Sequence, residues 1–341
     1  MDKQQVQQDV LYCGIDVSAK ELVVALDKHG KWQQRSFCNR QRGHHALIAW
    51  LQSRGSSVRV CLEATGIYGL DLAMALEKAE GIEVSVLNPR NASRFAETMR
   101  RSKTDPADAQ MLAEYARRMP WESWQPPPHT ALQLRSIMRQ VAAMTKQHTM
   151  QMNRLHAASG SATVPACVRL ELKRSLRHLA AGSLRLRQAA RTIVAQDQQL
   201  EERFQLLHTV PGIADLAALQ LLGELALMPP QLAVRQWVAC SGLDPRHHRS
   251  GTSVEKASRI SRAGNAHLRR ALYMPALVAS RRDPHLKAFY YNLATRRNSK
   301  LLALTAVARK MLHAIYGMFR SRSAYDGSRL FPNLVLDALA T

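Results

Sequence analysis

The sequence is poor in cysteine and in aromatic residues, and each shortage excludes a kind of site. Five cysteines stand far apart among 341 residues and form no Cys-x-x-Cys pair, which argues against a disulfide framework and against a zinc site. Aromatic residues make up only 6% of the chain, so a surface of stacked rings for nucleic-acid bases is not expected. We therefore expect reduced thiols and no large stacking platform.

Long apolar segments are also missing. The strongest candidate, Leu216 to Met228, is interrupted by Gln220 and Glu224, and it falls short of the roughly 20 residues that cross a bilayer. The first 14 residues contain no basic region followed by an apolar stretch, so a secretory signal is not expected. The sequence predicts a cytoplasmic protein without a membrane partner.

Acidic residues are scarce, and their distribution is uneven. The chain has 48 Lys and Arg against 26 Asp and Glu, a net charge of +22. Counting along the sequence gives 17 bases and 15 acids in residues 1–130, and 31 bases and 11 acids in residues 131–341. A net charge of +20 in residues 131–341 is unfavourable in a compact state because like charges repel, so it indicates a polyanionic partner. A basic surface that only keeps the protein in solution is the alternative.

Residues 1–125 have the pattern of an α/β domain. Three strand-like segments come first and suggest an antiparallel start, and helices and strands alternate after them. Asp105 followed by Pro106 is typical of a helix start. The expected strands cover residues 10–16, 21–27, 31–38, 57–62 and 82–87, and the expected helices cover residues 45–51, 70–76 and 105–118.

The rest of the chain is predicted to be all-α. Pro126, Pro127 and Pro128 cannot continue a helix and indicate a semi-rigid linker. Apolar residues at helical spacing then predict a basic helical hairpin or short coiled coil over residues 126–207. Residues 208–341 form the third expected domain, mostly helical with loops at 240–265.

Four acids stand at the ends of predicted elements. Asp16 closes the first strand in CGIDVSAK, Glu63 closes the fourth in CLEATGIYG, and Asp105 and Asp108 begin a helix in SKTDPADA. Strand ends share a sheet edge, and residues three apart share a helix face. Four carboxylates converge only around hard cations such as Mg²⁺ or Mn²⁺, which favours phosphoryl transfer in a ribonuclease-H-like site. Taken singly, each acid also fits a helix cap or a loop.

These three motifs resemble the acidic motifs of the DEDD-type insertion-sequence transposases, which are bridge-RNA-guided recombinases. The segments VPGIADLAALQLLGEL, ACSGLDPRHHRSGTS and ISRAGNAHLRRALYMPAL, at 210–225, 239–253 and 260–277, look like the C-terminal transposase domain of that family. The resemblance covers nearly the whole chain in order, and several separate motifs make it specific.

The resemblance implies a split active site. The first domain would resemble Holliday-junction resolvases and bind Mg²⁺ or Mn²⁺ through Asp16, Glu63, Asp105 and Asp108. Ser241 would attack DNA and form a covalent 5′-phosphoserine link. The expected partners are donor and target DNA, a non-coding bridge RNA and further copies of the chain, in a tetramer with composite sites. From the residues alone, Ser241 is equally a turn residue beside a glycine.

A dense group of basic residues surrounds this serine in the sequence and suits phosphate contacts, although each one singly fits a solvated surface charge. We expect the nucleic-acid-binding residues to be Lys103, Arg246, His247, His248, Arg249, Lys256, Arg259, Arg262, Arg269 and Arg270. The favoured function is an RNA-guided, Mg²⁺-dependent DNA recombinase. The alternatives are a metal-only nuclease or Holliday-junction resolvase, in which water attacks, and a non-catalytic nucleic-acid scaffold.

Overall fold

A computed structural model describes residues 10–28, 30–64, 66, 68–99, 104–250 and 254–331, with the backbone alone at 247–250 and 254–258. The chain divides into two compact units, Met1–Pro126 and Pro127–Thr341. The predicted boundary at residue 125 lies beside this division, and the helical segment predicted as a separate linker lies within the second unit. Within the described ranges, no helix is long and apolar enough to cross a membrane.

The first unit is built on a five-stranded mixed sheet. The strands are β1 (Leu11–Val17), β2 (Glu21–Lys28), β3 (Lys31–Cys38), β4 (Val58–Glu63) and β5 (Ile82–Leu87). Their order is β3-β2-β1-β4-β5. The first three strands pair antiparallel, and β1, β4 and β5 pair parallel. The predicted α/β class and its antiparallel start are confirmed.

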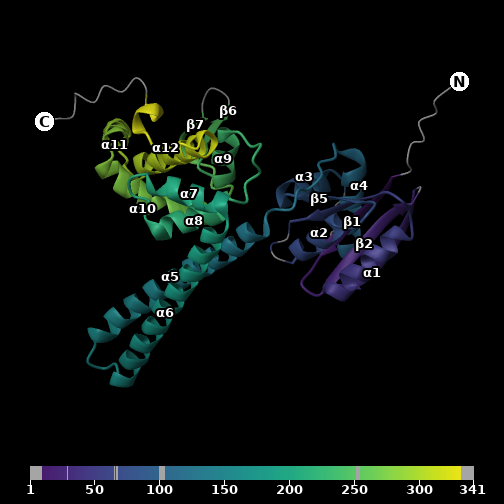
Figure 1. Ribbon diagram of the computed structural model, residues 1–341, viewed down its shortest axis with the longest axis horizontal. Helices are drawn as coiled ribbons and strands as arrows, with labels where there is room; N and C mark the ends of the chain where they lie inside the picture. Colours follow the sequence, from purple (N-terminus) through teal and green to yellow (C-terminus); the bar gives the residue numbers. More distant parts are fainter. Residues whose placement is uncertain are drawn as a thin grey trace. The chain divides into compact units, whose positions relative to one another are not determined.

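Helices cover both faces of this sheet (Figure 1). On one face, α1 (Gln41–Gln52) and α2 (Leu70–Glu77) pack against Cys13, Ile15 and their neighbours. On the other face, α3 (Pro89–Met99) and α4 (Asp105–Arg118) pack against Cys61 and Leu87. The helix predicted at 105–118 is confirmed, whereas α3 was not predicted, although Ala92, Phe95, Ala96 and Met99 follow helical spacing.

The contact between β1 and α4 is unusually close. A Cβ atom on Gly14 would lie 2.0 Å from the carbonyl oxygen of Ala109 and 2.4 Å from the nitrogen of Ala113. Only glycine therefore allows the backbone of α4 to rest directly on the strand. This contact fixes the depth at which α4 lies on the sheet.

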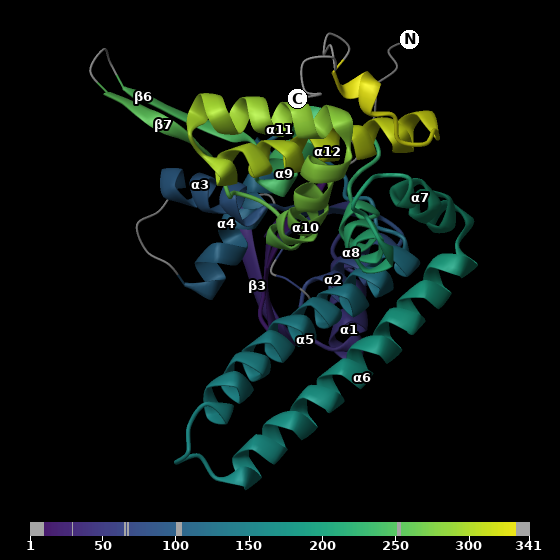
Figure 2. The same ribbon diagram turned by 90° about the vertical axis from the view of Figure 1, so that its left-hand side faces the viewer.

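The second unit is mainly helical. Its long helices α5 (His129–Ser159) and α6 (Ala166–Gln196) lie side by side, as Figures 1 and 2 show. The remaining helices are α7 (Gln198–His208), α8 (Asp215–Leu225), α9 (Val234–Ser241), α10 (Ala266–Arg282), α11 (Pro284–Arg297), α12 (Lys300–Ser321) and a short 3₁₀ turn, η1 (Gly327–Leu330). The predicted helical hairpin and helical C-terminal segment are present.

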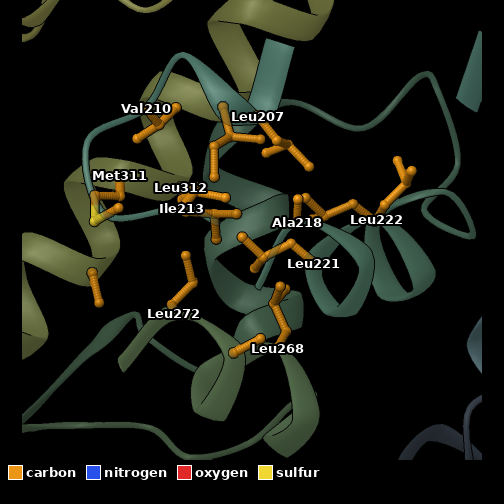
Figure 3. Packing of buried hydrophobic residues seen from close by; sticks show 14 of the residues in the cluster. Leu207, Val210, Ile213, Ala218, Leu221, Leu222, Leu268, Leu272, Met311 and Leu312 are labelled. Atoms are coloured by element: carbon orange, nitrogen blue, oxygen red, sulfur yellow. The ribbon is translucent and has the colours of Figure 1, made fainter. Parts of the chain in front are cut away.

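One apolar core joins these helices. Leu221 of α8 faces Leu268 and Leu272 of α10, and Leu312 of α12 lies beside Ile213 in the same core (Figure 3). The first part of α5 and the last part of α6 also contribute buried side chains to this core. The base of the helical hairpin is therefore anchored in the C-terminal helices, which explains why the two form a single unit.

The segment at 240–265 corrects the sequence prediction. It was expected to be loops, but β6 (Pro245–Ser250) and β7 (Val254–Ile260) pair antiparallel. This β6–β7 hairpin extends from the helices of its unit (Figure 2). Its residues are basic and polar, without the alternating apolar pattern that identifies a strand in a sequence.

Gly14→Ala tests the contact between β1 and α4. We expect the new methyl group to lower the stability of the first unit by about 2 kcal/mol, because the atoms that it meets are backbone and cannot move aside. The measurement is urea unfolding followed by tryptophan fluorescence in a Trp237→Phe background, where the remaining tryptophans all lie in the first unit. Gly55→Ala is the control in the same unit, since its new Cβ meets only atoms of the Leu11 side chain, which can move aside; equal midpoints for both variants would contradict the account.

Candidate functional site

Two of the predicted acids stand at the same edge and on the same face of the sheet. In the parallel pair β1 and β4, Gly14 is opposite Cys61 and Ile15 is opposite Leu62. Asp16 and Glu63 follow next in each strand, so both side chains point to the face of Gly14 and Cys61. That face is the one that α4 covers.

The direction of α4 brings the other two acids toward this edge. Near the C-terminal end of α4, the guanidinium of Arg117 lies 3.9 Å from the carboxylate of Asp27. Asp27 belongs to β2 and is opposite Tyr12 at the beginning of β1. The helix therefore runs against β1, and its first turn lies toward the end of that strand. Asp105 and Asp108 occupy this first turn.

The four acids suit a hard cation by their chemistry. Asp105 is exposed, and Asp16, Glu63 and Asp108 are half-buried. Carboxylate oxygens are the ligands that Mg²⁺ and Mn²⁺ prefer. Among the described residues, no three His, Cys, Asp or Glu side chains gather closely enough to hold a metal ion. Since carboxylates repel one another, we expect this group to draw together only around bound cations.

Ser241 is the last residue of α9 and is completely buried. Its hydroxyl donates to the carbonyl oxygen of Val238 at 2.6 Å and accepts the backbone N–H of Leu243 at 3.3 Å. Gly242 then ends the helix with a φ of 67°. In this geometry Ser241 acts as a helix-end residue, and its hydroxyl does not face solvent.

Ser241 belongs to the base of the β6–β7 hairpin, which we define as residues 240–245 and 260–265. Hydrogen bonds tie the two sides of this base: Asn265 N donates to Cys240 O at 2.7 Å, and Arg262 N donates to Gly242 O at 3.1 Å. Ser261 donates through its hydroxyl to the Asp244 carboxylate. The hairpin therefore leaves the helices from a well-ordered platform.

A buried acid that the sequence analysis did not select supports this platform. The Glu224 carboxylate accepts two hydrogen bonds from Arg139 of α5, at 2.7 and 2.9 Å, and one from the Asn265 side chain at 2.6 Å. Asn265 also caps the N-terminus of α10. Glu224 interrupts an apolar run, and an acid at such a position signals a buried polar partner.

The predicted nucleic-acid-binding residues divide into three groups. Arg246, Arg259, Arg262 and Arg270 are exposed, whereas the guanidinium of Arg269 donates to the carbonyl oxygens of Ser241 and Gly264. Arg269 therefore holds the hairpin base. The structure describes only the backbone of His247, His248, Arg249 and Lys256, and Lys103 lies outside the described residues.

Comparison with protein families identifies the class of protein. Residues 13–158, which include the four acids, match a family model described as a transposase. Residues 204–291, which include the β6–β7 hairpin, match the model of the transposase IS116/IS110/IS902 family. The chain is thus a DNA-processing transposase of an insertion sequence. It belongs to the IS110 family, as the resemblance of its motifs predicted.

Relatives agree with this assignment over most of the chain. Pilin gene-inverting proteins of Moraxella bovis and Moraxella lacunata are each 29% identical to this chain over 321 residues, which cover 92% of this chain and 97% of theirs. An uncharacterized 43.6 kDa protein of insertion element IS110 from Streptomyces coelicolor is 27% identical over 154 residues, which cover 43% of this chain and 37% of that protein.

The Glu224 network predicts a pH-dependent stability. Burial raises the pKa of Glu224, but the hydrogen bonds from Arg139 and Asn265, together with the charge of Arg139, outweigh burial and hold the pKa below its ordinary value. The ionised carboxylate therefore stabilises the unit fully above pH about 4.3, and this contribution is lost as the pH falls through the lowered pKa.

We expect Glu224→Gln to lower the free energy of unfolding by about 2 kcal/mol at pH 7, with a smaller difference from wild type below pH 4. Denaturant titrations at several pH values measure this. Glu171→Gln is the matched control. Glu171 forms an ion pair with Arg174, but the two side chains are 72% and 62% exposed, so this pair contributes little to the free energy of unfolding. A constant difference at all pH values would contradict the account.

Proposed function

We propose that this transposase cuts and rejoins DNA strands with divalent cations bound by Asp16, Glu63, Asp105 and Asp108. The observation that carries the proposal is the common face of Asp16 and Glu63 at adjacent strand ends, which is the face on which α4 packs, with Asp105 and Asp108 in its first turn. The strand order β3-β2-β1-β4-β5 supports a ribonuclease-H-like domain, similar to Holliday-junction resolvases.

In this proposal the first unit positions the scissile phosphate. Two half-buried carboxylates on the sheet and two on α4 approach the cations from different elements, so that a rigid framework fixes the ligand geometry. Mg²⁺ or Mn²⁺ would neutralise charge on the phosphate and activate the attacking oxygen. The N-terminus of α4 adds a positive dipole end beside the same group.

The second unit supplies the attacking hydroxyl in the favoured version of this proposal. A serine would displace the 3′ oxygen of the broken strand and keep the phosphate as a 5′-phosphoserine ester, so that rejoining needs no ATP. The family resemblance assigns this role to Ser241. Its hydroxyl is buried and bonded to Val238, so attack by Ser241 requires the last turn of α9 to open.

The burial of Ser241 favours a second candidate function, a metal-only nuclease or resolvase in which water attacks. Two other serines of the same segment provide the comparison: Ser250 ends β6, and Ser261 lies in the hairpin base. The attacking group is therefore tested by comparing individual serine variants.

The basic second unit would hold the nucleic acids. Residues 131–200 carry 11 Lys and Arg against 2 acids, which suits contacts to the backbone of a bridge RNA on the α5–α6 hairpin. The exposed arginines of residues 246–270 suit donor and target DNA. We further propose a tetramer whose sites combine the acids of one subunit with the serine of another. The names of the Moraxella relatives, which describe inversion of a gene, are consistent with strand exchange.

Asp105→Asn combined with Asp108→Asn tests the metal-binding role. We expect at least about a thousandfold slower cleavage of DNA from the ends of the element, with Mg²⁺ and RNA transcribed from the same element, because the cation loses two ligands. Glu77→Gln combined with Glu80→Gln is the control, since these acids lie on and just after α2 and are exposed. Wild-type rates in the Asp105 and Asp108 variant, or full activity in EDTA, would refute the metal site.

The serine is tested by trapping a covalent adduct. Labelled DNA from the end of the element is incubated with wild type, Ser241→Ala, Ser250→Ala and Ser261→Ala, and the products are separated under denaturing conditions. If a serine attacks, we expect a covalent protein–DNA adduct with wild type and no adduct with the variant that lacks the attacking serine. If Ser241 attacks, Ser241→Ala forms none. Cleavage without any adduct, unchanged in all three variants, would favour attack by water.

A further inference from the structure

A cleft opens on the face of the first unit opposite the acids. It has a volume of about 1050 Å³ and lies between α1 and α2, which pack on the same face of the sheet. Ala19, Asn39 and Tyr68 line one end of it, and they follow β1, β3 and β4. This end therefore stands at the sheet edge where Asp16 and Glu63 close their strands.

The loops at that end are tied together by one side chain. The amide of Asn39 donates to the carbonyl oxygens of Ser18 at 2.8 Å and Tyr68 at 3.0 Å. Its oxygen lies 2.8 Å from Nε2 of His44 on α1. Asn39 thus joins three loops and a helix, so the end of the cleft is a built feature and not a chance gap.

The rim of the cleft is basic. Arg40 and His45 at the start of α1 and Lys78 at the end of α2 line it, and all three are exposed. Within the described part of the chain, Arg40 and Lys78 form no ion pair. The cleft has one acidic side chain among its lining residues, Asp71. The lining therefore carries two cationic side chains against one carboxylate.

His44 adds no fixed charge. Burial lowers the pKa of His44, the carboxylate of Asp71 raises it, and His45 lowers it, so the net pKa lies below the ordinary value. A neutral ring suits the hydrogen bond with Asn39. The positive charge that faces a ligand therefore comes from Arg40 at the start of α1 and Lys78 at the end of α2, which stand on different sides of the cleft.

An aromatic ring is exposed at the same end. Tyr68 is 51% exposed and lines the cleft. Tyr68 lies five residues after Glu63, on the loop that leaves the acidic edge. An accessible ring beside separated cationic groups is the arrangement that binds unpaired bases and their phosphates together.

We propose that this cleft binds a single-stranded segment of nucleic acid, with phosphates at Arg40 and Lys78 and one base stacked on Tyr68. The inference rests on the proposed function for the kind of polymer. A single strand fits better than a duplex, because a base in a duplex already stacks on its neighbours. The bound segment would be the strand that continues past the acidic edge, and it is either DNA or RNA.

Fluorescence anisotropy with labelled 12-mers of oligo(dT) and oligo(U) tests the cleft in full-length protein with EDTA, so that no chemistry occurs. We expect Arg40→Ala combined with Lys78→Ala to weaken binding roughly tenfold and to reduce the slope of log affinity against log salt by about 1.4, since two phosphate contacts are lost. Arg42→Ala combined with Lys31→Ala removes the same charge outside the cleft and should change both quantities less. The oligonucleotide, oligo(dT) or oligo(U), whose affinity falls more in the Arg40 and Lys78 variant identifies the bound strand as DNA or RNA.

Tyr68 is tested independently. Tyr68→Ala should weaken binding several-fold and Tyr68→Phe should restore it, because a phenyl ring still stacks. A 12-mer with one 5-iodouracil should crosslink under ultraviolet light to a peptide containing Tyr68. Crosslinks confined to the second unit, together with equal binding by the cleft and control variants, would overturn the inference. Binding is measured in EDTA, so these tests are independent of the cleavage assay. If the cleft variants bind as the control does but wild type still cleaves DNA with Mg²⁺, the cleft proposal fails and the proposed function stands. If the cleft variants bind more weakly but wild type does not cleave DNA, the proposed function fails and the cleft proposal stands.

Discussion

The close contact between α4 and β1 is the constraint on which the rest of the first unit depends. Gly14 allows the backbone of α4 to rest on the sheet, and this fixes the height of the first turn, where Asp105 and Asp108 stand. Asp16 is the last residue but one of the same strand, and its parallel neighbour ends at Glu63. One glycine thus links the packing of the domain to the position of its acids. A side chain at this position would lift the helix and its two carboxylates away from the strand ends.

The second unit depends on a different interaction, the buried carboxylate of Glu224. It joins α5, α8 and the cap of α10, and the backbone of Asn265 continues the connection to Cys240, beside Ser241. The helical hairpin and the β6–β7 hairpin are therefore held by one polar network inside an apolar core. This arrangement connects the segment proposed to bind RNA with the segment proposed to bind DNA and to carry the attacking serine.

Much of the first unit could be predicted from sequence because its central strands are short apolar runs and Asp105 with Pro106 marks a helix start. The family was predicted because several motifs occur in order. The β6–β7 hairpin was not predicted, since strands rich in Arg and His lack apolar alternation. The burial of Ser241 also escaped prediction, because burial depends on how Gly242 and Arg269 close the end of α9. The network of Glu224 and the α1–α2 cleft join residues far apart in the chain, and no local pattern reports such contacts.

The central claim is that the four acids hold divalent cations beneath the first turn of α4. Crystals of the protein soaked in MnCl₂ and measured at the manganese absorption edge test it most directly. The account predicts anomalous density within about 2.5 Å of carboxylate oxygens of Asp16, Glu63, Asp105 and Asp108. Ordered manganese bound elsewhere, with none at these four residues, would contradict it.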